Sequence, residues 1–164
     1  MLTIRPATIS DVPAILAIYN DAIENLTATF DLTPQTLEER RVWFQQFGER
    51  YPIFAAEWDG EFAGYACLTM YRVKPAYSRT AELSIYLDKR FHGRGIGTGL
   101  MGEVLREAEA RGFHVILSAI TGGNETSVRL HHKFGFELVG TFKEVGYKFG
   151  AWQDVWFYQK TLNA

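Results

Sequence analysis

The chain has 164 residues, of which 47% are hydrophobic and 22% charged, a composition that excludes the disordered and fibrous classes. Its 17 Lys and Arg stand against 19 Asp and Glu, and this net charge of -2 argues against a nucleic-acid partner, which would favour a basic excess. Because the chain has one cysteine, no signal-peptide pattern and no apolar run near the roughly 20 residues that span a bilayer, we expect a cytoplasmic protein without a membrane partner, folded as a single domain over residues 1–164.

The first half of the chain alternates between strand and helix signals. Alternating apolar and polar residues predict a strand at 2–5. Ser10 is a good N-cap for a helix with an apolar face, and Thr33-Pro34 repeats the start signal for a second helix that Gly48 ends. Strands at 53–58 and 62–70 are joined by Asp59-Gly60, a tight hairpin signal, and a polar, basic loop follows.

The second half continues in the same manner. We expect strands at 81–87, 113–119, 137–141 and 154–162, with helices from Gly95 to Arg111 and from Asn124 to Lys133. No repeat or linker interrupts this order. The pattern predicts an α+β fold of mixed α/β layers, in which helices flank a central, mostly antiparallel, twisted sheet.

A glycine-rich turn, HGRGIG at residues 92–97, follows a predicted strand and opens a predicted helix. Its alternating glycines leave backbone N–H groups free to face one point, and the helix N-terminus adds its dipole. The turn therefore predicts a phosphate or pyrophosphate site. It is not a P-loop, and the G-x-G-x-x-G match at 97–102 falls inside the helix without the acidic residue that a dinucleotide site needs.

Coenzyme A fits this turn better than a nucleotide triphosphate or a dinucleotide. It carries a pyrophosphate and a long pantetheine arm with two amides. The strand immediately before the turn, residues 82–87, can present an open edge with which such an arm pairs as an extended peptide would.

The chain resembles the GNAT superfamily of acyl-CoA N-acyltransferases. The glycine turn matches, with His92 where the family usually has Gln or Arg, and Asn124 and Gly135-Phe136 match the ends of the family's next helix. Residues 80–87, 127–131 and 146–155 are similar to phosphinothricin and methionine sulfoximine/sulfone N-acetyltransferases. The similarity covers nearly the whole chain. The departures are at Phe149, Ala151 and Gln153.

The resemblance implies acetyl-CoA as acyl donor. Direct transfer needs a neutral amine, and Glu82 starts the strand that leads to the glycine turn, so it is the candidate general base. The other candidate catalytic residue is His131, which stands where many members place a proton-donating Tyr and which is either an acid for the leaving thiolate or a packed helix residue. The candidate cofactor-binding residues are Ile85, Tyr86, Leu87, His92, Gly93, Arg94, Gly95, Ile96, Gly97, Thr98 and Asn124.

Cations in the loop before the catalytic strand can bind a carboxylate or a phosphinate, and the resemblance places Arg72 and Tyr77 in the substrate pocket. Phe30 is either a pocket wall or part of the core. The candidate substrate-binding residues are Phe30, Arg72, Val73, Lys74, Tyr77, Glu82, Leu83 and Ser84.

The expected function is acetylation of the α-amine of a small amino-acid-like compound, such as phosphinothricin, methionine sulfoximine or methionine sulfone. Two alternatives remain: acetylation of another amine (an antibiotic, a polyamine or a protein N-terminus), or a non-catalytic acetyl-CoA sensor. The His residues and Cys67 lack metal-ligand spacing, so we expect no metal. Aromatic residues make up 15% of the chain, which favours a homodimer.

Overall fold

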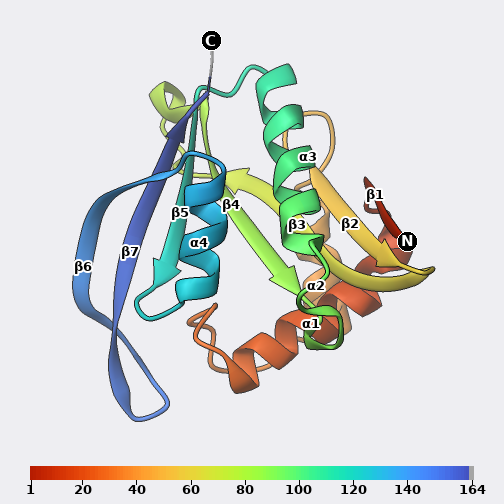
Figure 1. Ribbon diagram of the computed structural model, residues 1–164, viewed down its shortest axis with the longest axis horizontal. Helices are drawn as coiled ribbons and strands as arrows, with labels where there is room; N and C mark the ends of the chain where they lie inside the picture. The colour runs from red at the N-terminus through yellow and green to blue at the C-terminus, as the bar shows by residue number, and fades with distance from the viewer. Residues whose placement is uncertain (163–164) are drawn as a thin grey trace.

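The computed structural model describes residues 1–162, whose strands form one seven-stranded sheet in the order β1-β2-β3-β4-β5-β7-β6 (Figure 1). Residues 163 and 164, the end of the expected domain, lie outside the described part. Within it, no helix is both long and apolar enough to cross a membrane. The strands are β1 (Leu2–Pro6), β2 (Ile53–Trp58), β3 (Glu61–Met70), β4 (Thr80–Leu87), β5 (Val115–Thr121), β6 (Glu137–Lys148) and β7 (Ala151–Thr161), and the helices are α1 (Val12–Asn25), α2 (Leu37–Phe44), α3 (Ile96–Ala110) and α4 (Glu125–Lys133).

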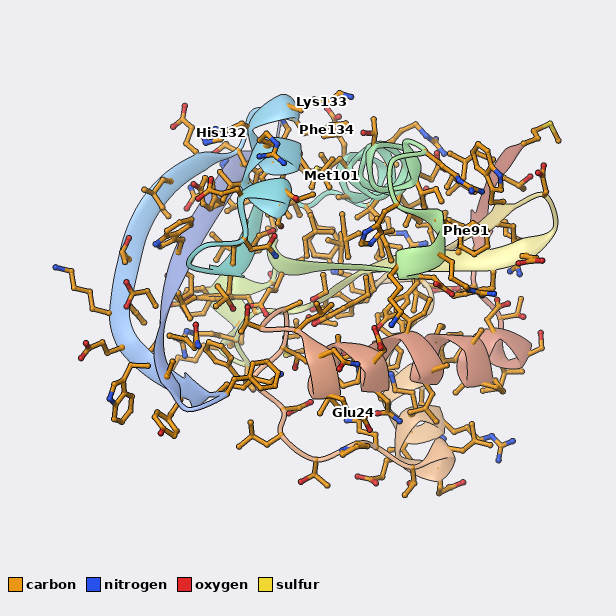
Figure 2. The ribbon with its side chains drawn as sticks, turned by 60° about the horizontal axis from the view of Figure 1, so that its bottom comes forward. Glu24, Phe91, Met101, His132, Lys133 and Phe134 are labelled. Carbon is orange, nitrogen blue, oxygen red and sulfur yellow. The ribbon has the colours of Figure 1, made fainter. Side chains whose placement is uncertain are left out.

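Helices cover both faces of this sheet, with α1 and α2 on one side and α3 and α4 on the other (Figure 2). The period-two alternation of β3 supplies both cores. Tyr65 and Cys67 pack in the cluster that contains α1, whereas Ala66 and Leu68 pack with Met101 of α3. The sheet is antiparallel except for the pair β4–β5, which confirms the predicted α+β class with a mostly antiparallel sheet.

The one parallel pair of the described residues is short. Thr80–Glu82 of β4 pair with Val115–Leu117 of β5, and beyond these residues the two strands separate. On their other sides, β5 pairs with β7 along its whole length, and residues 81–87 of β4 pair with β3. The edge of β4 from Leu83 to Leu87 is therefore left without a strand partner, and a wedge opens in the middle of the sheet.

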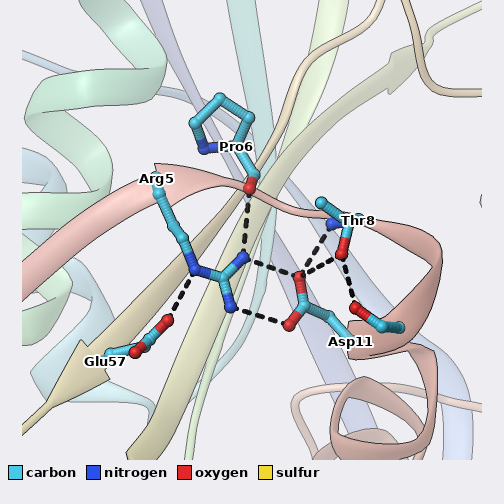
Figure 3. A network of polar contacts seen from close by, with 6 residues as sticks. Arg5, Pro6, Thr8, Asp11 and Glu57 are labelled. Carbon is cyan, nitrogen blue, oxygen red and sulfur yellow. Dashed lines mark hydrogen bonds and ion pairs between the residues drawn. The ribbon is translucent and has the colours of Figure 1, made fainter. Parts of the chain in front are cut away.

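The start of α1 differs from the prediction. Asp11, rather than Ser10, is its N-cap. The Asp11 carboxylate accepts two hydrogen bonds of 2.8 Å from the guanidinium of Arg5, and one of its oxygens also accepts from the backbone N–H of Thr8 at 2.7 Å (Figure 3). Arg5 donates to Glu57 as well, so β1, β2 and the start of α1 are joined through one guanidinium.

The start of the second helix was also predicted wrongly. Thr33-Pro34 lies in a loop, and α2 begins after Thr36. Thr36 Oγ1 accepts from the Glu39 N–H, and Glu39 Oε1 accepts from the Thr36 N–H, both at 3.1 Å. This reciprocal capping box satisfies two backbone donors, which a Thr-Pro start does not. The helix ends at Phe44 and does not reach Gly48.

The C-terminal strands are longer than predicted. β6 and β7 have 12 and 11 residues and run to a tight turn at Phe149 and Gly150, whose φ values are 55° and 72°. Positive φ suits such a hairpin, and no Asn-Gly or Asp-Gly pair marked it in the sequence. β5 starts at Val115, two residues later than expected.

Candidate active site

A cavity of about 780 Å³ occupies the wedge between β4 and β5. The end of α1, the first turn of α3 and α4 close its remaining sides. The cavity brings together most of the residues that the sequence predicted for the cofactor, together with Leu83, Ser84 and His131. The predicted cofactor residues that line it are Ile85, Tyr86, Leu87, His92, Gly93, Gly95, Ile96, Gly97, Thr98 and Asn124.

The glycine turn forms one end of this cavity. Gly93 and Gly95 have φ values of +78° and +75°, and a Cβ atom on either would meet nothing within 4 Å. Gly95 is the N-cap of α3, and no side chain caps this helix end. The backbone N–H groups of the first turn therefore face open space beside the positive end of the helix dipole, as an anion site requires. Gly97 has a packing role instead, because a Cβ atom on it would lie 3.2 Å from the side chain of Leu130 on α4.

Arg94 does not line the cavity, although it lies within the turn. Its guanidinium is 5.2 Å from the ring centroid of Trp58 and 5.5 Å from that of Phe91, and the residue is exposed. Asn124 is placed by its role as the cap of α4, where its Oδ1 accepts a 3.2 Å hydrogen bond from the Ser127 N–H.

Glu82 lies at the apex of the wedge. It is the last residue at which β4 pairs with β5, and it lies opposite Thr69 of β3. Its side chain is half-buried, and this burial raises the pKa of the carboxyl above its usual 4.5. A carboxylate with a raised pKa accepts a proton more readily, which suits a general base.

A second cavity of about 230 Å³ lies on the α1–α2 side of the sheet. Ser84 and Tyr86 line both cavities, so the two spaces lie on either side of these two residues. Glu82 shares their face of β4, because side chains two positions apart point to the same side. The other residues that line the second cavity are Tyr19, Asp31, Gln35, Arg40, Trp43, Tyr65, Cys67 and Thr69.

His131 is buried against the wall of the larger cavity, with 4% of its surface exposed. Its Nδ1 lies 2.7 Å from the Ser127 carbonyl oxygen, which can only accept, so Nδ1 carries the proton. Nε2 then accepts from the hydroxyl of Ser118 at 2.8 Å. Burial lowers the pKa of the imidazole, so this hydrogen-bonded His131 is neutral. These contacts favour the packed alternative for His131.

Five predicted substrate residues lie elsewhere. Arg72, Val73, Lys74 and Tyr77 are exposed on the loop between β3 and β4 and line neither cavity. Phe30 packs against β6, where a Cβ atom on Gly146 would lie 2.5 Å from its ring. Glu82 lines neither cavity, although Thr69, its partner on β3, lines the second one. Of the predicted substrate residues, Leu83 and Ser84 line the larger cavity, and Ser84 lines the second as well.

Of the residues that line the second cavity, only Ser84 and Tyr86 were predicted from the sequence as site residues. The one signal for it is Arg40, which lies three residues after Leu37 and three before Trp43, within the apolar stripe of the predicted helix. A charged residue at such a position is expected to be buried and to need a partner.

Comparison with known proteins agrees with this geometry. Residues 15–136 match the profile of the "Acetyltransferase (GNAT) family". The chain belongs to this GNAT acetyltransferase family. The resemblance found in the sequence is thereby confirmed.

Three GNAT relatives cover nearly the whole chain. The L-methionine sulfoximine/L-methionine sulfone acetyltransferase of Pseudomonas aeruginosa is 40% identical over 98% of this chain and 95% of its own. The structure of a phosphinothricin acetyltransferase from Sinorhizobium meliloti in complex with acetyl-CoA superposes with a TM-score of 0.95 at 35% identity, covering 99% and 89% of the two chains. The structure of a ribosomal-protein-alanine N-acetyltransferase from Brucella melitensis superposes with a TM-score of 0.92 at 42% identity, covering 98% of this chain and 99% of its own.

Proposed function

We propose that this GNAT acetyltransferase transfers the acetyl group of acetyl-CoA directly to the α-amine of a small amino-acid-like substrate. The phosphinothricin, methionine sulfoximine and methionine sulfone types are the proposed substrates. The observation that carries the proposal is the meeting of two cavities at Ser84 and Tyr86, beside Glu82. One cavity suits an acyl donor with a pyrophosphate, and the other suits a small acceptor.

The larger cavity fits acetyl-CoA in three respects. Its volume, about 780 Å³, lies within the range of roughly 300–1,000 Å³ that is usual for ligand sites. The open space before Gly93 and Gly95 suits the pyrophosphate. The free edge of β4 from Leu83 to Leu87 suits the amides of the pantetheine arm.

When bound, acetyl-CoA supplies an acetyl group on a thioester, and the incoming amine must be neutral to replace the thiol. Glu82 takes the proton of the substrate ammonium, directly or through one water, and its raised pKa favours this. Backbone N–H groups along the free edge of β4 can donate to the negative charge that develops on the acyl oxygen. The products are an amide, the free thiol of coenzyme A and one proton.

His131 has a positioning role in this scheme. The one N–H of its neutral imidazole is engaged by the Ser127 carbonyl oxygen, so no proton is available on Nε2 for a leaving thiolate. We propose that His131 holds the Ser118 hydroxyl in place and that water protonates the thiolate.

The rival acceptor is a peptide α-amine, which the name of the Brucella relative raises. The second cavity, of about 230 Å³, suits a single amino acid. A thiol-release assay with acetyl-CoA tests both, with methionine sulfoximine, phosphinothricin, a polyamine and an Ala-starting peptide as acceptors. We expect release with the first two. Release with the peptide alone would contradict the small-molecule proposal, and no release with any amine would favour the sensor.

We also propose a homodimer. β6 is an edge strand of the sheet, and Val139, Phe142, Val145 and Tyr147 on it are each more than half exposed. A long apolar edge is normally covered, and a second copy would cover it. Light scattering should give the mass of a dimer, and Phe142→Lys should shift it to a monomer while Lys143→Gln does not. A monomeric wild type at all concentrations would exclude this interface.

A reducing, cytoplasmic setting fits the free thiol. Cys67 is buried, and burial raises its pKa to about 12, so the thiol stays protonated and unreactive. We also propose that the enzyme confers resistance to phosphinothricin, because N-acetylation removes the free α-amine of this toxic amino acid. Growth of cells that express the chain, with phosphinothricin in the medium, tests this.

A further inference from the structure

Arg40 of α2 is a buried cation at the wall of the second cavity, with 3% of its surface exposed. Its Nη2 donates to the Tyr65 hydroxyl at 2.8 Å and its Nη1 to Gln35 Oε1 at 3.2 Å. Its Nε is buried and has no hydrogen-bond partner. Two of the five N–H donors of the guanidinium are therefore used by the protein, and the Nε edge remains free.

The guanidinium is held in one orientation by aromatic rings. It lies 3.5 Å from the ring centroid of Trp43 and 4.0 Å from that of Tyr19. Stacking of this kind fixes the plane of a guanidinium but does not neutralise its charge. Within residues 1–162, no carboxylate lies within ion-pair distance of Arg40. Asp31, which also lines the cavity, is hydrogen-bonded to the hydroxyl of Tyr19.

A buried charge is normally paired, because desolvation of an unpaired ion is costly. An anion that reached this side of the cavity would supply the partner that the described residues do not give Arg40. A planar fork with a free Nε edge matches a carboxylate or a phosphinate, each of which offers two oxygens in one plane.

Resting on the proposed function, we propose that Arg40 binds an oxyanion of the acceptor substrate in the second cavity. The substrate lies in about 230 Å³ of space, with its amine toward Ser84 and Glu82 and its anionic group on the guanidinium. The α-carboxylate and a side-chain phosphinate share this chemistry. Arg40 thus selects amines that carry an oxyanion.

Three acceptors with related carbon chains distinguish the α-carboxylate from the side-chain phosphinate as the group that Arg40 binds. Phosphinothricin carries a phosphinate and an α-carboxylate, methionine sulfone carries only the α-carboxylate, and 3-(methylsulfonyl)propylamine carries neither anion. Each is measured with wild type, Arg40→Gln, Arg40→Lys and the matched control Arg41→Gln, which changes an exposed cation on the same helix. Loss of a charge-assisted hydrogen bond should lower kcat/KM of Arg40→Gln by roughly 10- to 100-fold for an anionic acceptor.

Sensitivity to Arg40→Gln for both amino acids but not for the sulfonyl amine would support contact with the α-carboxylate. Sensitivity confined to phosphinothricin would support contact with the phosphinate. An equal loss for all three acceptors, or no loss, would overturn the proposal. Arg40→Lys keeps the charge and should recover part of the loss, which covers the case in which the Gln variant does not fold.

Binding gives a second readout that does not depend on turnover. Calorimetry with coenzyme A present should show weaker binding of phosphinothricin to Arg40→Gln, with unchanged binding of acetyl-CoA alone. If wild type acetylates none of the three acceptors and binds none of them, the proposed function fails. If wild type acetylates and binds them while Arg40→Gln matches it, only the role of Arg40 fails.

Discussion

The imidazole Nε2 of His131 on α4 lies 2.8 Å from the hydroxyl oxygen of Ser118 on β5. Both residues are more than nine-tenths buried, and both line the larger cavity. This bond ties a helix that closes the cavity to the strand that forms its wall. In the neutral form of His131, Nδ1 donates to the Ser127 carbonyl oxygen and Nε2 accepts this bond from the Ser118 hydroxyl.

We expect His131 to make the stability depend on pH. Burial lowers its pKa below the usual 6.5, so the unfolded chain binds this proton at a higher pH than the native protein does. The free energy of unfolding should therefore fall as the pH falls from about 6.5 toward the folded pKa. Urea titrations measure this free energy at several pH values. Over this interval it should fall less in His131→Gln than in wild type, and His132→Gln, at an exposed histidine, is the control. Equal pH dependence in all three proteins would contradict a buried neutral His131.

Glu82→Gln should lower kcat by about 100- to 10,000-fold, the usual contribution of a general base. The amide cannot take the ammonium proton, whereas the acetyl-CoA cavity is unchanged, so the dissociation constant of acetyl-CoA should stay the same. Because the pKa of Glu82 is raised above 4.5, wild-type activity should fall as the pH drops through that raised pKa. This fall of activity at acid pH should be absent from Glu82→Gln. Wild-type turnover in Glu82→Gln, with Glu61→Gln as control, would exclude Glu82 as base.

Gly95→Ala should weaken acetyl-CoA binding. The new Cβ would extend into the open space before the α3 N-terminus, and the positive φ of 75° costs a non-glycine residue about 1–2 kcal/mol. We expect KM for acetyl-CoA to rise about tenfold or more, since one tenfold step is about 1.4 kcal/mol. Gly48→Ala, at an exposed glycine with open space and no positive φ, is the control. Equal KM values in the two variants would argue against an anion site in this turn.

Asp11→Asn should lower the free energy of unfolding by about 1–3 kcal/mol, because Arg5 loses a buried charged partner. Hydrogen bonds from Arg5 hold the pKa of Asp11 below its usual 3.8, so this stabilisation is present above that value and is lost as the pH falls through the lower, folded pKa. Asp59→Asn removes an exposed partner of the N-terminus and should change stability by less than about 1 kcal/mol. Thermal unfolding at neutral and acid pH measures both variants, and equal losses would contradict a special role for Asp11.

Much of this fold could be predicted from the sequence, because its signals are local. The Asp59-Gly60 hairpin, the glycine turn before α3 and the Asn124 cap of α4 each depend on a few adjacent residues. The start of α2 was predicted wrongly, although its signals are also local. Two N-cap signals, at Thr33 and Thr36, stand three residues apart, and the capping-box spacing from Thr36 to Glu39, which Thr33 lacks, was overlooked.

The site could be predicted only in part. Glu82 and the glycine turn carry motifs, whereas the second cavity is built from α1, α2, β3 and β4, which meet only in the folded chain. The separation of β4 from β5 leaves no mark on either strand, since register between distant strands has no local signature. Arg40 came closest to being predictable, as a charge in an apolar stripe.

The short parallel pairing of β4 with β5 makes the bound donor a structural member of the sheet. Three residues of each strand connect β1–β4 to β5–β7, and past them the sheet is interrupted. A pantetheine arm that pairs with β4 would continue the sheet across this gap. Ligand at 100 times its dissociation constant would add about 2.7 kcal/mol to folding, and amide protection along β4 should rise with it. The protein would then be two half-sheets that its own co-substrate joins at each turnover.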